Sequence, residues 1–450
     1  MTTLTPPTPP DIAPYQARRA RLIERMRAAG GGVALVPTAP ECIRNRDTHY
    51  PYRYDSYFHY LSGFAEPEAV LVLVAGDTPE STLFCRAKDE EKEVWDGFRH
   101  GPDAAREQFG FDQAFTIGDL DLKLPELLAD QPVLWCGWGY DPAWDARIAR
   151  ALQAVRNNAR AGATAPAVMR DIRAELDEMR LIKDPGELTI MRRAGEISGL
   201  AHRRAMRATR PERHEYEIEA ELLHAFRSAG SQAPAYPSIV ASGANACVLH
   251  YVDNNRRMRD GELLLIDAGC ELDGYASDIT RSFPVNGRFS AAQRDVYELV
   301  LAAQTAAKQE IRPGASWNAP HDAAVKVIAQ GLLDLKLLTG ALDDVIEQGH
   351  YRRYYMHRTG HWLGRDVHDV GQYKVGGDWR PLEAGMVLTV EPGCYIRPAP
   401  DIPEAFWNIG VRIEDDAVVT DDGCDFITDT APRTVTEIEE VMRERQHDAA

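Results

Sequence analysis

The last two-fifths of the chain repeatedly place a metal-binding side chain at or near the end of an apolar, strand-like run. Five residues follow this pattern: Asp267, Asp278, His361, Glu391 and Glu414. An unpaired charge is costly to bury at the end of a strand, so these groups are expected to share a cation. Four carboxylates and an imidazole, without a thiolate, suit one or two divalent cations better than a closed structural zinc site. The chemistry indicated is metal-assisted hydrolysis.

The segment 261–285 predicts a hairpin that carries both aspartates. An Asp273-Gly274 loop, which is a common two-residue turn, would place Asp267 opposite Thr280. A Leu272-Asp273 loop would place Asp267 directly opposite Asp278. In both registers the aspartates share a face, because side chains alternate along a strand. A three-residue loop without a bulge would separate them, so the hairpin alone leaves their proximity open.

The two glutamates lie in similar strand-like surroundings. Glu391 ends the apolar run MVLTVE, and the following Pro392 favours an extended backbone there. In GVRIEDD, Arg412 and Glu414 point the same way because they are two residues apart on a strand. Arg412 can therefore orient or neutralise a group beside Glu414. Taken singly, each glutamate would be interpreted as a surface residue at a strand end.

Four histidines are candidates for the same site. His357 and His361 have the i, i+4 spacing of a helical zinc pair, but Arg358 excludes the H-E-x-x-H pattern. The glycines in HRTGHWLGRDVHDVG predict an irregular or strand-like path instead. Together with His368, this gives three histidines within twelve residues, which favours a functional site over isolated polar residues. His250 is a fourth candidate, and its sequence neighbours favour neither interpretation.

A chain of 450 residues is expected to form two domains. The N-terminal half alternates helix-like segments with apolar runs, which favours a mixed α/β domain. A helix is expected over residues 14–29, and strands over Gly32–Pro37, Glu68–Ala75, Ser81–Arg86 and Val133–Cys136. In the second part, blocks of helices and blocks of strands favour an α+β domain with an antiparallel sheet covered by helices.

The domain boundary is expected between residues 165 and 185. Residues 167–182 have a helical pattern, and Asp184 then begins a new helix as its N-cap, with Glu187 three positions later. We therefore expect a loose Pro-rich segment at residues 1–12, an N-terminal domain over 13–175 and a C-terminal domain over 176–445.

Composition excludes several classes of function. The formal net charge of −18 argues against nucleic acid and anionic lipid as partners, because no basic field is available. No run approaches the roughly 18 apolar residues of a membrane span. The N-terminus lacks the apolar run of a signal peptide. The seven cysteines are scattered without a C-x-x-C pair, which favours a reducing compartment. We expect a cytoplasmic protein.

Residues 44–69 are rich in tyrosine and arginine and allow two interpretations. The segment can be a half-buried loop and strand in which tyrosines fill space. It can also be a surface that meets a partner subunit or borders a cleft.

The ordered set of five ligands resembles that of the pita-bread metallopeptidases. Within that family, HWLGRDVHDVG, TVEPGCYI and GVRIEDD are similar to the Xaa-Pro aminopeptidase (aminopeptidase P) branch. YPYR, GFAEPEAVLVL and MRLIKDPGEL in the first half are similar to that branch too. The resemblance spans about residues 12 to 442. It implies a pita-bread catalytic domain after an N-terminal domain of the creatinase/aminopeptidase P type.

The resemblance also implies a site with two divalent cations, usually Mn²⁺, with Zn²⁺ or Co²⁺ as possibilities. In the family pattern Asp267 binds one ion, and His361 and Glu391 bind the other. Asp278 and Glu414 bridge both ions. A hydroxide between the ions attacks the scissile carbonyl, and the substrate is a peptide with proline at its second position. Relatives of this kind form homodimers or homotetramers.

The resemblance further implies roles for the residues around the ligands. Glu391 would move a proton from water to the leaving proline nitrogen. His250, His357 and His368 would bind substrate and steady the tetrahedral intermediate. Arg412 would help to hold the bridging carboxylate. The sequence departs from the family pattern at Arg365, where an apolar residue is expected.

Three other functions are alternatives within this resemblance. A prolidase, which cleaves only Xaa-Pro dipeptides, would share the same chemistry. A catalytically inactive pita-bread binding module is disfavoured because all five ligands are present. A methionine aminopeptidase is disfavoured because those enzymes lack a large N-terminal domain.

Overall fold

The computed structural model describes residues 11–444 of the chain. The chain divides into two compact units, one that ends at Met179 and one that begins at Arg180. The segment 1–12, expected to be loose, lies outside the described residues except for its last two. The boundary expected after residue 175 falls within a helix that joins the two units, α7 (Arg173–Leu181).

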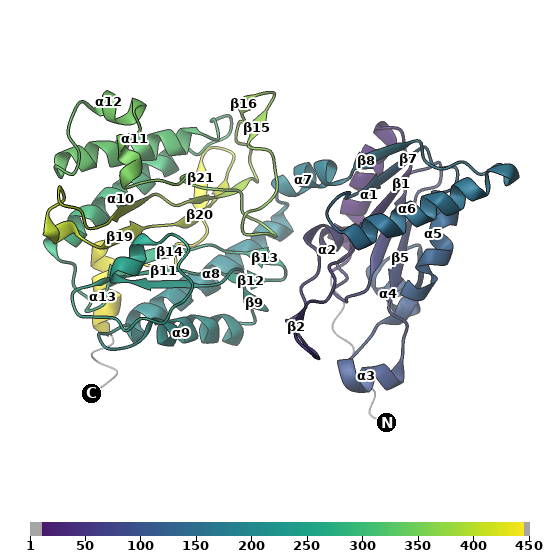
Figure 1. Ribbon diagram of the computed structural model, residues 1–450, viewed down its shortest axis with the longest axis horizontal. Helices are drawn as coiled ribbons and strands as arrows, with labels where there is room; N and C mark the ends of the chain where they lie inside the picture. Colours follow the sequence, from purple (N-terminus) through teal and green to yellow (C-terminus); the bar gives the residue numbers. More distant parts are fainter. Residues whose placement is uncertain (1–10, 445–450) are drawn as a thin grey trace. The chain divides into compact units, whose positions relative to one another are not determined.

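The first unit consists of strands interleaved with helices (Figure 1). Its helices, besides α7, are α1 (Ala13–Ala28), α2 (Ser56–Ser62), α3 (Glu90–Asp96), α4 (Gly101–Phe109), α5 (Leu120–Leu128) and α6 (Pro142–Asn157), with the 3-10 turns η1 (Ile117–Asp119) and η2 (Ala159–Ala161). Its strands are β1 (Val33–Pro37), β2 (Ile43–Asn45), β3 (Thr48–His49), β4 (Val70–Val74), β5 (Glu80–Cys85), β6 (Gln113–Thr116), β7 (Val133–Cys136) and β8 (Val168–Asp171).

Six of these strands form one mixed sheet in the order β6-β5-β4-β1-β7-β8. The sheet carries helices on both faces, so its central strands are apolar on both sides. On β1, Ala34 and Val36 pack in one cluster with side chains of α1, α2 and α4. The alternate residues Val33 and Leu35 pack in another cluster with α5 and α6. The expected α/β architecture of this half is confirmed.

The helix expected over residues 167–182 is wrong at its beginning. Residues 168–171 form strand β8, which pairs in parallel with β7. The helix α7 begins only at Arg173. Residues 168–171 form a strand because they pair with a segment more than thirty residues earlier in the chain. The local helical pattern of the sequence gives no information on such a long-range pairing.

The Tyr- and Arg-rich segment divides into two parts with different surroundings. The hairpin β2–β3 is exposed along its whole length. The following helix α2 buries Phe58, Tyr60 and Leu61 in the core. The interpretation that tyrosines of this segment fill space in the core therefore applies to α2. The hairpin remains a candidate surface for contact with a partner.

The second unit is built from antiparallel strands and long helices. Its helices are α8 (Pro185–Ala208), α9 (Glu215–Ser228), α10 (Ala291–Gln309), α11 (Ala319–Asp334), α12 (Leu342–Glu347) and α13 (Val435–Glu444), with the 3-10 turns η3 (Gly243–Cys247), η4 (His350–Arg353) and η5 (Glu404–Phe406). Its strands are β9 (Ala233–Pro234), β10 (Ile239–Ser242), β11 (Leu263–Asp267), β12 (Cys270–Leu272), β13 (Tyr275–Ala276), β14 (Thr280–Pro284), β15 (Lys374–Val375), β16 (Asp378–Trp379), β17 (Val387–Val390), β18 (Gly393–Ile396), β19 (Ile409–Arg412), β20 (Asp415–Val419) and β21 (Cys424–Phe426).

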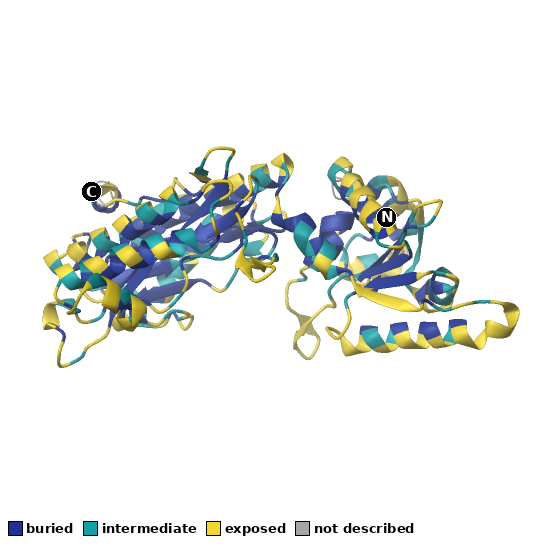
Figure 2. Ribbon diagram, turned by 90° about the horizontal axis from the view of Figure 1, so that it is seen from above, coloured by how far each residue is buried: buried dark blue, intermediate teal, exposed yellow. Residues whose placement is uncertain are grey.

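The helices of this unit cover one face of its strands. Leu264 and Ile266 of β11 pack in a large core with α8, α9, α10 and α13. Leu265, between them, faces a smaller cluster with Ile239 of β10. In Figure 2 the strands of this unit are dark blue and the outer faces of its helices are yellow. Asp267 is two residues after Leu265, so alternation directs it away from the helices.

Helix α8 begins as its sequence predicts. The side chain of Asp184 accepts a hydrogen bond from the backbone N–H of Glu187, and the Glu187 carboxylate accepts one from Asp184 N–H, at 2.9 Å each. Among residues 11–444, no helix is long and apolar enough to cross a membrane.

Helix α8 buries a histidine directly behind the strand that ends in Asp267. His202 is fully buried, and its Nε2–H donates to the carbonyl oxygen of Ala268 at 2.9 Å. Burial lowers the pKa of His202 from 6.5 to about 4. Between pH 6.5 and about pH 4 the unfolded chain therefore binds a proton at this residue that the folded chain does not.

We predict that His202 makes the folded protein less stable as the pH falls from 6.5 towards 4. The free energy of unfolding lost through His202 reaches roughly 3 kcal/mol, because a pKa change of one unit corresponds to about 1.4 kcal/mol. His202→Gln retains an N–H donor but does not titrate. Urea unfolding at pH 7.5 and pH 4.5 should show a smaller loss of stability in this variant than in the wild type. Equal losses in the two proteins would show that His202 has an ordinary pKa.

Candidate metal centre

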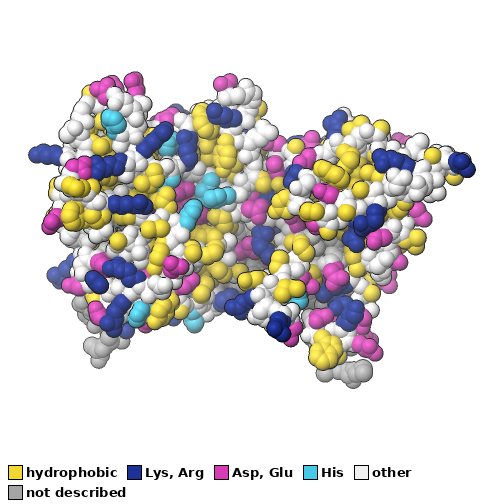
Figure 3. Space-filling view, viewed as in Figure 1, with side chains coloured by type: hydrophobic (Ala, Val, Ile, Leu, Met, Phe, Trp, Pro, Cys, Tyr) yellow, Lys and Arg dark blue, Asp and Glu magenta, His cyan; other side chains and the backbone are white. Residues whose placement is uncertain are grey.

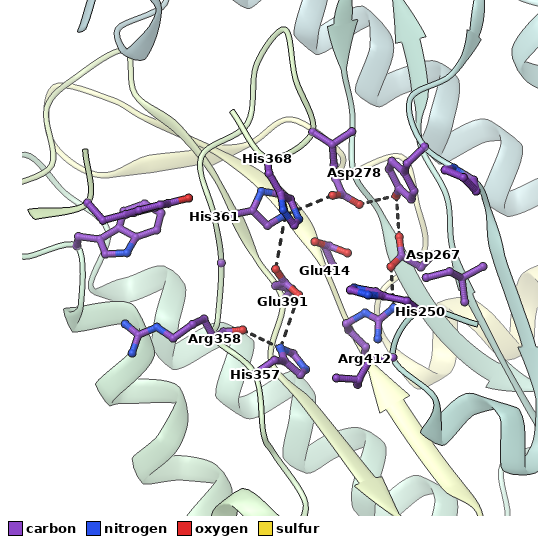
Figure 4. A pocket seen from close by; sticks show the side chains of 18 of the residues that line it. His250, Asp267, Asp278, His357, Arg358, His361, His368, Glu391, Arg412 and Glu414 are labelled. Carbon is purple, nitrogen blue, oxygen red and sulfur yellow. Dashed lines mark hydrogen bonds and ion pairs between the residues drawn. The ribbon is translucent and has the colours of Figure 1, made fainter. Parts of the chain in front are cut away.

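The five residues that the sequence singles out as ligands come together in the second unit. Asp267, Asp278, His361, Glu391 and Glu414 all line one cavity of about 900 Å³. Its wall also includes His250, His357, His368 and Arg412. Figure 4 shows these labelled side chains pointing into the cavity from several strands and loops. Figure 3 shows histidine side chains gathered on this face of the unit, with basic and apolar side chains around them.

The hairpin that carries the two aspartates adopts the Asp273-Gly274 turn. Both turn residues have positive φ, 50° and 76°, as a type I′ turn requires. Asp267 pairs with Thr280, which is the register predicted for this turn. The Tyr236 hydroxyl contacts both aspartates, with its oxygen 2.7 Å from Asp267 Oδ1 and 2.5 Å from Asp278 Oδ1. The two carboxylates therefore lie side by side.

His361 reaches the cavity from an extended segment that runs along β17. The Thr389 N–H donates to the His361 carbonyl at 2.9 Å, and the Glu391 N–H donates to the Thr359 carbonyl at 2.8 Å. Between these contacts lies Gly360, where a Cβ would lie 2.1 Å from the Thr389 carbonyl oxygen. A glycine is needed for this close approach. The path is irregular and extended, as the glycine pattern predicts.

The imidazole of His361 has the orientation of a metal ligand. Its Nδ1–H donates to the Trp362 carbonyl at 2.9 Å, which leaves Nε2 directed at the carboxylates. Nε2 lies 3.5 Å from Asp278 Oδ2 and 3.7 Å from Glu391 Oε1. Among residues 11–444, a ligand atom each from Asp278, His361 and Glu414 lie within 4.8 Å of one another.

Crowding of buried charges shifts the pKa of every ligand. Burial raises the pKa of Asp267, Glu391 and Glu414. The pKa of Glu391 rises to about 7, and that of Glu414 rises well above its ordinary value. Burial alone would raise the pKa of Asp278, but the hydrogen bond and charge of His361 lower it. Burial would lower the pKa of His361, yet Asp278 and Glu391 raise it to about 9. Protons thus balance charges that divalent cations would otherwise balance.

This donor set fits a pair of divalent cations. It offers carboxylate oxygens and one imidazole within a buried pocket, and it contains no thiolate. Four negative charges in one cavity are stable only with compensating positive charge. The residues around them supply one fixed cation, because Arg412 Nη2 donates to Asp267 Oδ2 at 2.6 Å.

Arg412 is held by a chain of hydrogen bonds that ends at His357. Its Nη1 donates to the Tyr395 hydroxyl at 3.0 Å, and that hydroxyl lies 2.8 Å from His357 Nε2. His357 Nδ1–H donates to the Arg358 carbonyl at 2.7 Å. With Nδ1 as donor, Nε2 accepts from the Tyr395 O–H. Burial lowers the pKa of His357 to about 3, so its ring is neutral.

His250 and His368 line the cavity without a hydrogen bond to any other residue between 11 and 444. The ring centres of His368 and His361 are 4.1 Å apart. Their ring nitrogens are therefore available to a bound molecule. Asp278 is supported from behind, since its backbone N–H donates to the buried Asp416 carboxylate at 3.0 Å.

The segment that carries His250 is fastened by a buried carboxylate. Glu215, the first residue of α9, is fully buried and accepts five hydrogen bonds. The donors are Ser242 N–H and Oγ–H at 2.7 Å each, Asn245 Nδ2 at 3.2 Å, Tyr251 O–H at 2.7 Å and Arg256 N–H at 2.9 Å. Tyr251 is adjacent to His250, so Glu215 holds the Tyr251 side chain on one side of residues 252–255 and the Arg256 backbone on the other.

Tyr236, Tyr395 and Glu215 are site residues that the sequence pattern does not predict. Tyr395 lies within the run TVEPGCYI, and its place there is the one signal in the sequence. Tyr236 and Glu215 reach the site only through long-range contacts. The unusual Arg365 does not line the cavity; it is buried, with its guanidinium 4.7 Å from the centre of the Tyr275 ring. The Arg365 side chain is therefore not part of the cavity wall.

Comparison with known proteins assigns both parts of the chain. Residues 189–421 match the model of metallopeptidase family M24. Residues 15–135 match that of the aminopeptidase P N-terminal domain. The chain is 46% identical to Xaa-Pro aminopeptidase of Escherichia coli K12 over 431 residues, which cover 95% of this chain and 97% of that protein.

Solved structures agree over the full length. Aminopeptidase PepP of Pseudomonas aeruginosa superimposes with a TM-score of 0.94 at 49% identity and covers 96% of this chain and 99% of that chain. Zinc-substituted E. coli aminopeptidase P in complex with product superimposes with a TM-score of 0.94 at 44% identity, covering 97% of this chain and 99% of that chain.

We predict that Glu215→Gln lowers kcat about tenfold while metal content is unchanged. An amide cannot accept all five hydrogen bonds, so the segment that holds His250 loosens. The effect should be tested in a double-mutant cycle with His250→Ala. If Glu215 acts through His250, its replacement costs little activity once His250 is absent.

Glu187→Gln is the matched control, because Glu187 is also buried and accepts from Tyr275 O–H at 2.7 Å, outside the cavity wall. It should reduce stability but leave kcat at the wild-type value. Additive losses in the cycle with His250→Ala would contradict the positioning role of Glu215.

Proposed function

The chain belongs to metallopeptidase family M24, and we propose how its cavity performs the reaction of an Xaa-Pro aminopeptidase. It is a metallopeptidase that hydrolyses the bond between an N-terminal residue and a following proline. Its catalytic unit has the pita-bread fold, after an aminopeptidase P N-terminal domain. One observation carries the mechanism: four carboxylates and an imidazole from distant segments meet in one buried cavity.

These contacts support the ligand assignment. Asp278 and Glu414 would bind both cations, since Asp278 lies between Asp267 and His361 and Glu414 lies close to Asp278 and His361. His361 and Glu391 would complete one ion site, since His361 Nε2 is near Asp278 and Glu391. Asp267, beside Asp278 at the Tyr236 hydroxyl, would complete the other.

When bound, a pair of divalent cations lowers the pKa of a water between them and polarises the scissile carbonyl. Glu391 would then accept the proton of the attacking water and donate it to the proline nitrogen as the bond breaks. Its pKa of about 7 without metal shows how strongly burial favours the protonated form of this carboxylate. Thr389 orients the carboxylate by donating from Oγ1 to Glu391 Oε1 at 3.3 Å.

The other three histidines of the cavity, His250, His357 and His368, would contact substrate rather than metal. His250 and His368 are free to donate to the substrate carbonyl and to steady the oxyanion of the tetrahedral intermediate. Neutral His357, held by the Tyr395 hydroxyl, would line the leaving-group side next to Glu391, since His357 Nδ1 lies 3.7 Å from Glu391 Oε2. The substrate's free ammonium group would lie near Asp267, which favours release of a single residue.

We further propose Mn²⁺ as the metal, with Zn²⁺ as an alternative. Oxygen donors dominate the site, and such a set suits Mn²⁺. A zinc-substituted form of E. coli aminopeptidase P exists as a solved structure. Metal analysis of protein purified without chelators, followed by reloading with each ion, distinguishes the two.

The assembly and location are also proposals. The exposed β2–β3 hairpin supports a homodimer or homotetramer in which it contacts another subunit. All seven cysteines lie within the described residues, and none forms a disulfide. This supports a reducing compartment, and we propose the cytoplasm.

We predict that Arg-Pro-Pro is hydrolysed with a kcat/KM at least about tenfold above that of Arg-Pro in the presence of Mn²⁺. The cavity of about 900 Å³ is at the upper end of the range for small-molecule sites, which favours more than a dipeptide. Release of free arginine, followed by chromatography, measures both reactions. A strong preference for the dipeptide would identify a prolidase instead.

We predict that Asp278→Ala abolishes both metal binding and activity, because it removes a carboxylate shared by the two ion sites. His250→Ala should retain the full metal content and lower kcat about 10²–10³-fold, as expected for loss of one oxyanion donor. Inductively coupled plasma analysis and peptide hydrolysis give the two readouts. Loss of metal from His250→Ala would mean that His250 is a ligand.

A further inference from the structure

The catalytic cavity has an acidic part and a basic part. Two of its lining residues are cations that the mechanism does not use, Arg358 and Lys374. They occur in a chain whose formal net charge is −18. Arg358 directly follows His357, whereas Lys374 comes from the short strand β15.

An aromatic residue joins the two cations into one surface. The Arg358 guanidinium carbon is 5.1 Å from the centre of the Trp379 ring, and Lys374 Nζ is 4.4 Å from it. Trp379 also lines the cavity, and in β16 it is the direct cross-strand partner of Lys374. Contacts of this kind hold flexible basic side chains near one ring.

The two positive charges are not neutralised by the protein. Within residues 11–444, neither Arg358 nor Lys374 forms an ion pair with a carboxylate. Arg358 Nη2 donates instead to the neutral side-chain oxygen of Asn318. The Asn318 amide is itself fixed, because its Nδ2 donates to both carboxylate oxygens of Asp322 at 2.7 and 2.8 Å. This arrangement orients the guanidinium and leaves its charge available to a ligand.

The basic surface lies on the leaving-group side of the reacting bond. Figure 4 shows Arg358 and Asp267 on opposite sides of Glu391. A peptide whose ammonium group lies near Asp267 and whose scissile bond lies near Glu391 would extend its next residues towards Arg358. Each added residue advances the chain by up to about 3.5 Å.

We propose that Arg358, Lys374 and Trp379 form a subsite for the α-carboxylate of short peptides that carry proline at position two. The inference rests on the proposed function and adds a substrate class to it: peptides of three or four residues with a free C-terminus. The two cations bind the carboxylate, and Trp379 packs against the apolar part of the last residue. The subsite binds substrate and takes no part in bond cleavage.

The test compares Arg-Pro-Pro with its C-terminal amide, Arg-Pro-Pro-NH₂, under identical metal loading. The free acid should have a kcat/KM about tenfold higher, mainly through a lower KM, as expected for a charge-assisted hydrogen bond. In Arg358→Ala/Lys374→Ala the ratio of kcat/KM for the acid to kcat/KM for the amide should fall to about one. Arg358→Lys should retain part of the preference because it keeps the charge.

Lys336→Ala is the control, since Lys336 is a lysine outside the cavity wall, and it should keep the wild-type ratio of acid to amide. Equal KM values for acid and amide in the wild type would overturn the subsite while leaving the aminopeptidase assignment intact. An acid-to-amide ratio that stays near tenfold in the double variant would also overturn it. Failure to release arginine from either peptide would instead contradict the proposed function.

Discussion

Mutual repulsion among four buried carboxylates is the constraint on which the catalytic unit depends. Asp267, Asp278, Glu391 and Glu414 share a cavity in which each charge is costly. Protons and the guanidinium of Arg412 offset this repulsion, as the raised pKa values of Glu391 and Glu414 show. A pair of divalent cations would neutralise the same repulsion and would also supply the electrophilic chemistry of the reaction. Stability and catalysis therefore both require positive charge in this cavity.

A second layer of polar residues keeps the ligands in place. On β20 the consecutive residues Asp415 and Asp416 are both fully buried but face opposite sides. Asp416 accepts from the backbone of Asp278, whereas Asp415 accepts from Arg281 Nη2 at 2.7 Å. Arg281 in turn donates to the Glu414 carbonyl at 2.6 Å. One strand thus fixes two ligands through backbone groups, without touching their carboxylates.

The sequence predicts those features that arise from local chemistry. The Asp273-Gly274 turn determines the register that places Asp267 beside Asp278, and Asp184 determines where α8 begins. Strand β8 was mistaken for helix because its pairing with β7 is non-local. Glu215 was missed for the same reason: an acidic residue at a helix start is common, and its five donors come from residues that become neighbours only after folding. The convergence of the ligands was inferred from family resemblance as much as from the residues.

The Asp273-Gly274 turn also bears on the order in which the chain folds. It closes a short loop, so Asp267 and Asp278 can meet early and at little entropic cost. His361, Glu391 and Glu414 lie roughly a hundred residues further on, and their arrival requires the topology of the whole unit. This turn allows the two carboxylates to pair before the remaining ligands arrive, and a cation bound at that stage would act as a nucleus. The metal content of the medium would then influence the rate of refolding as well as the final stability.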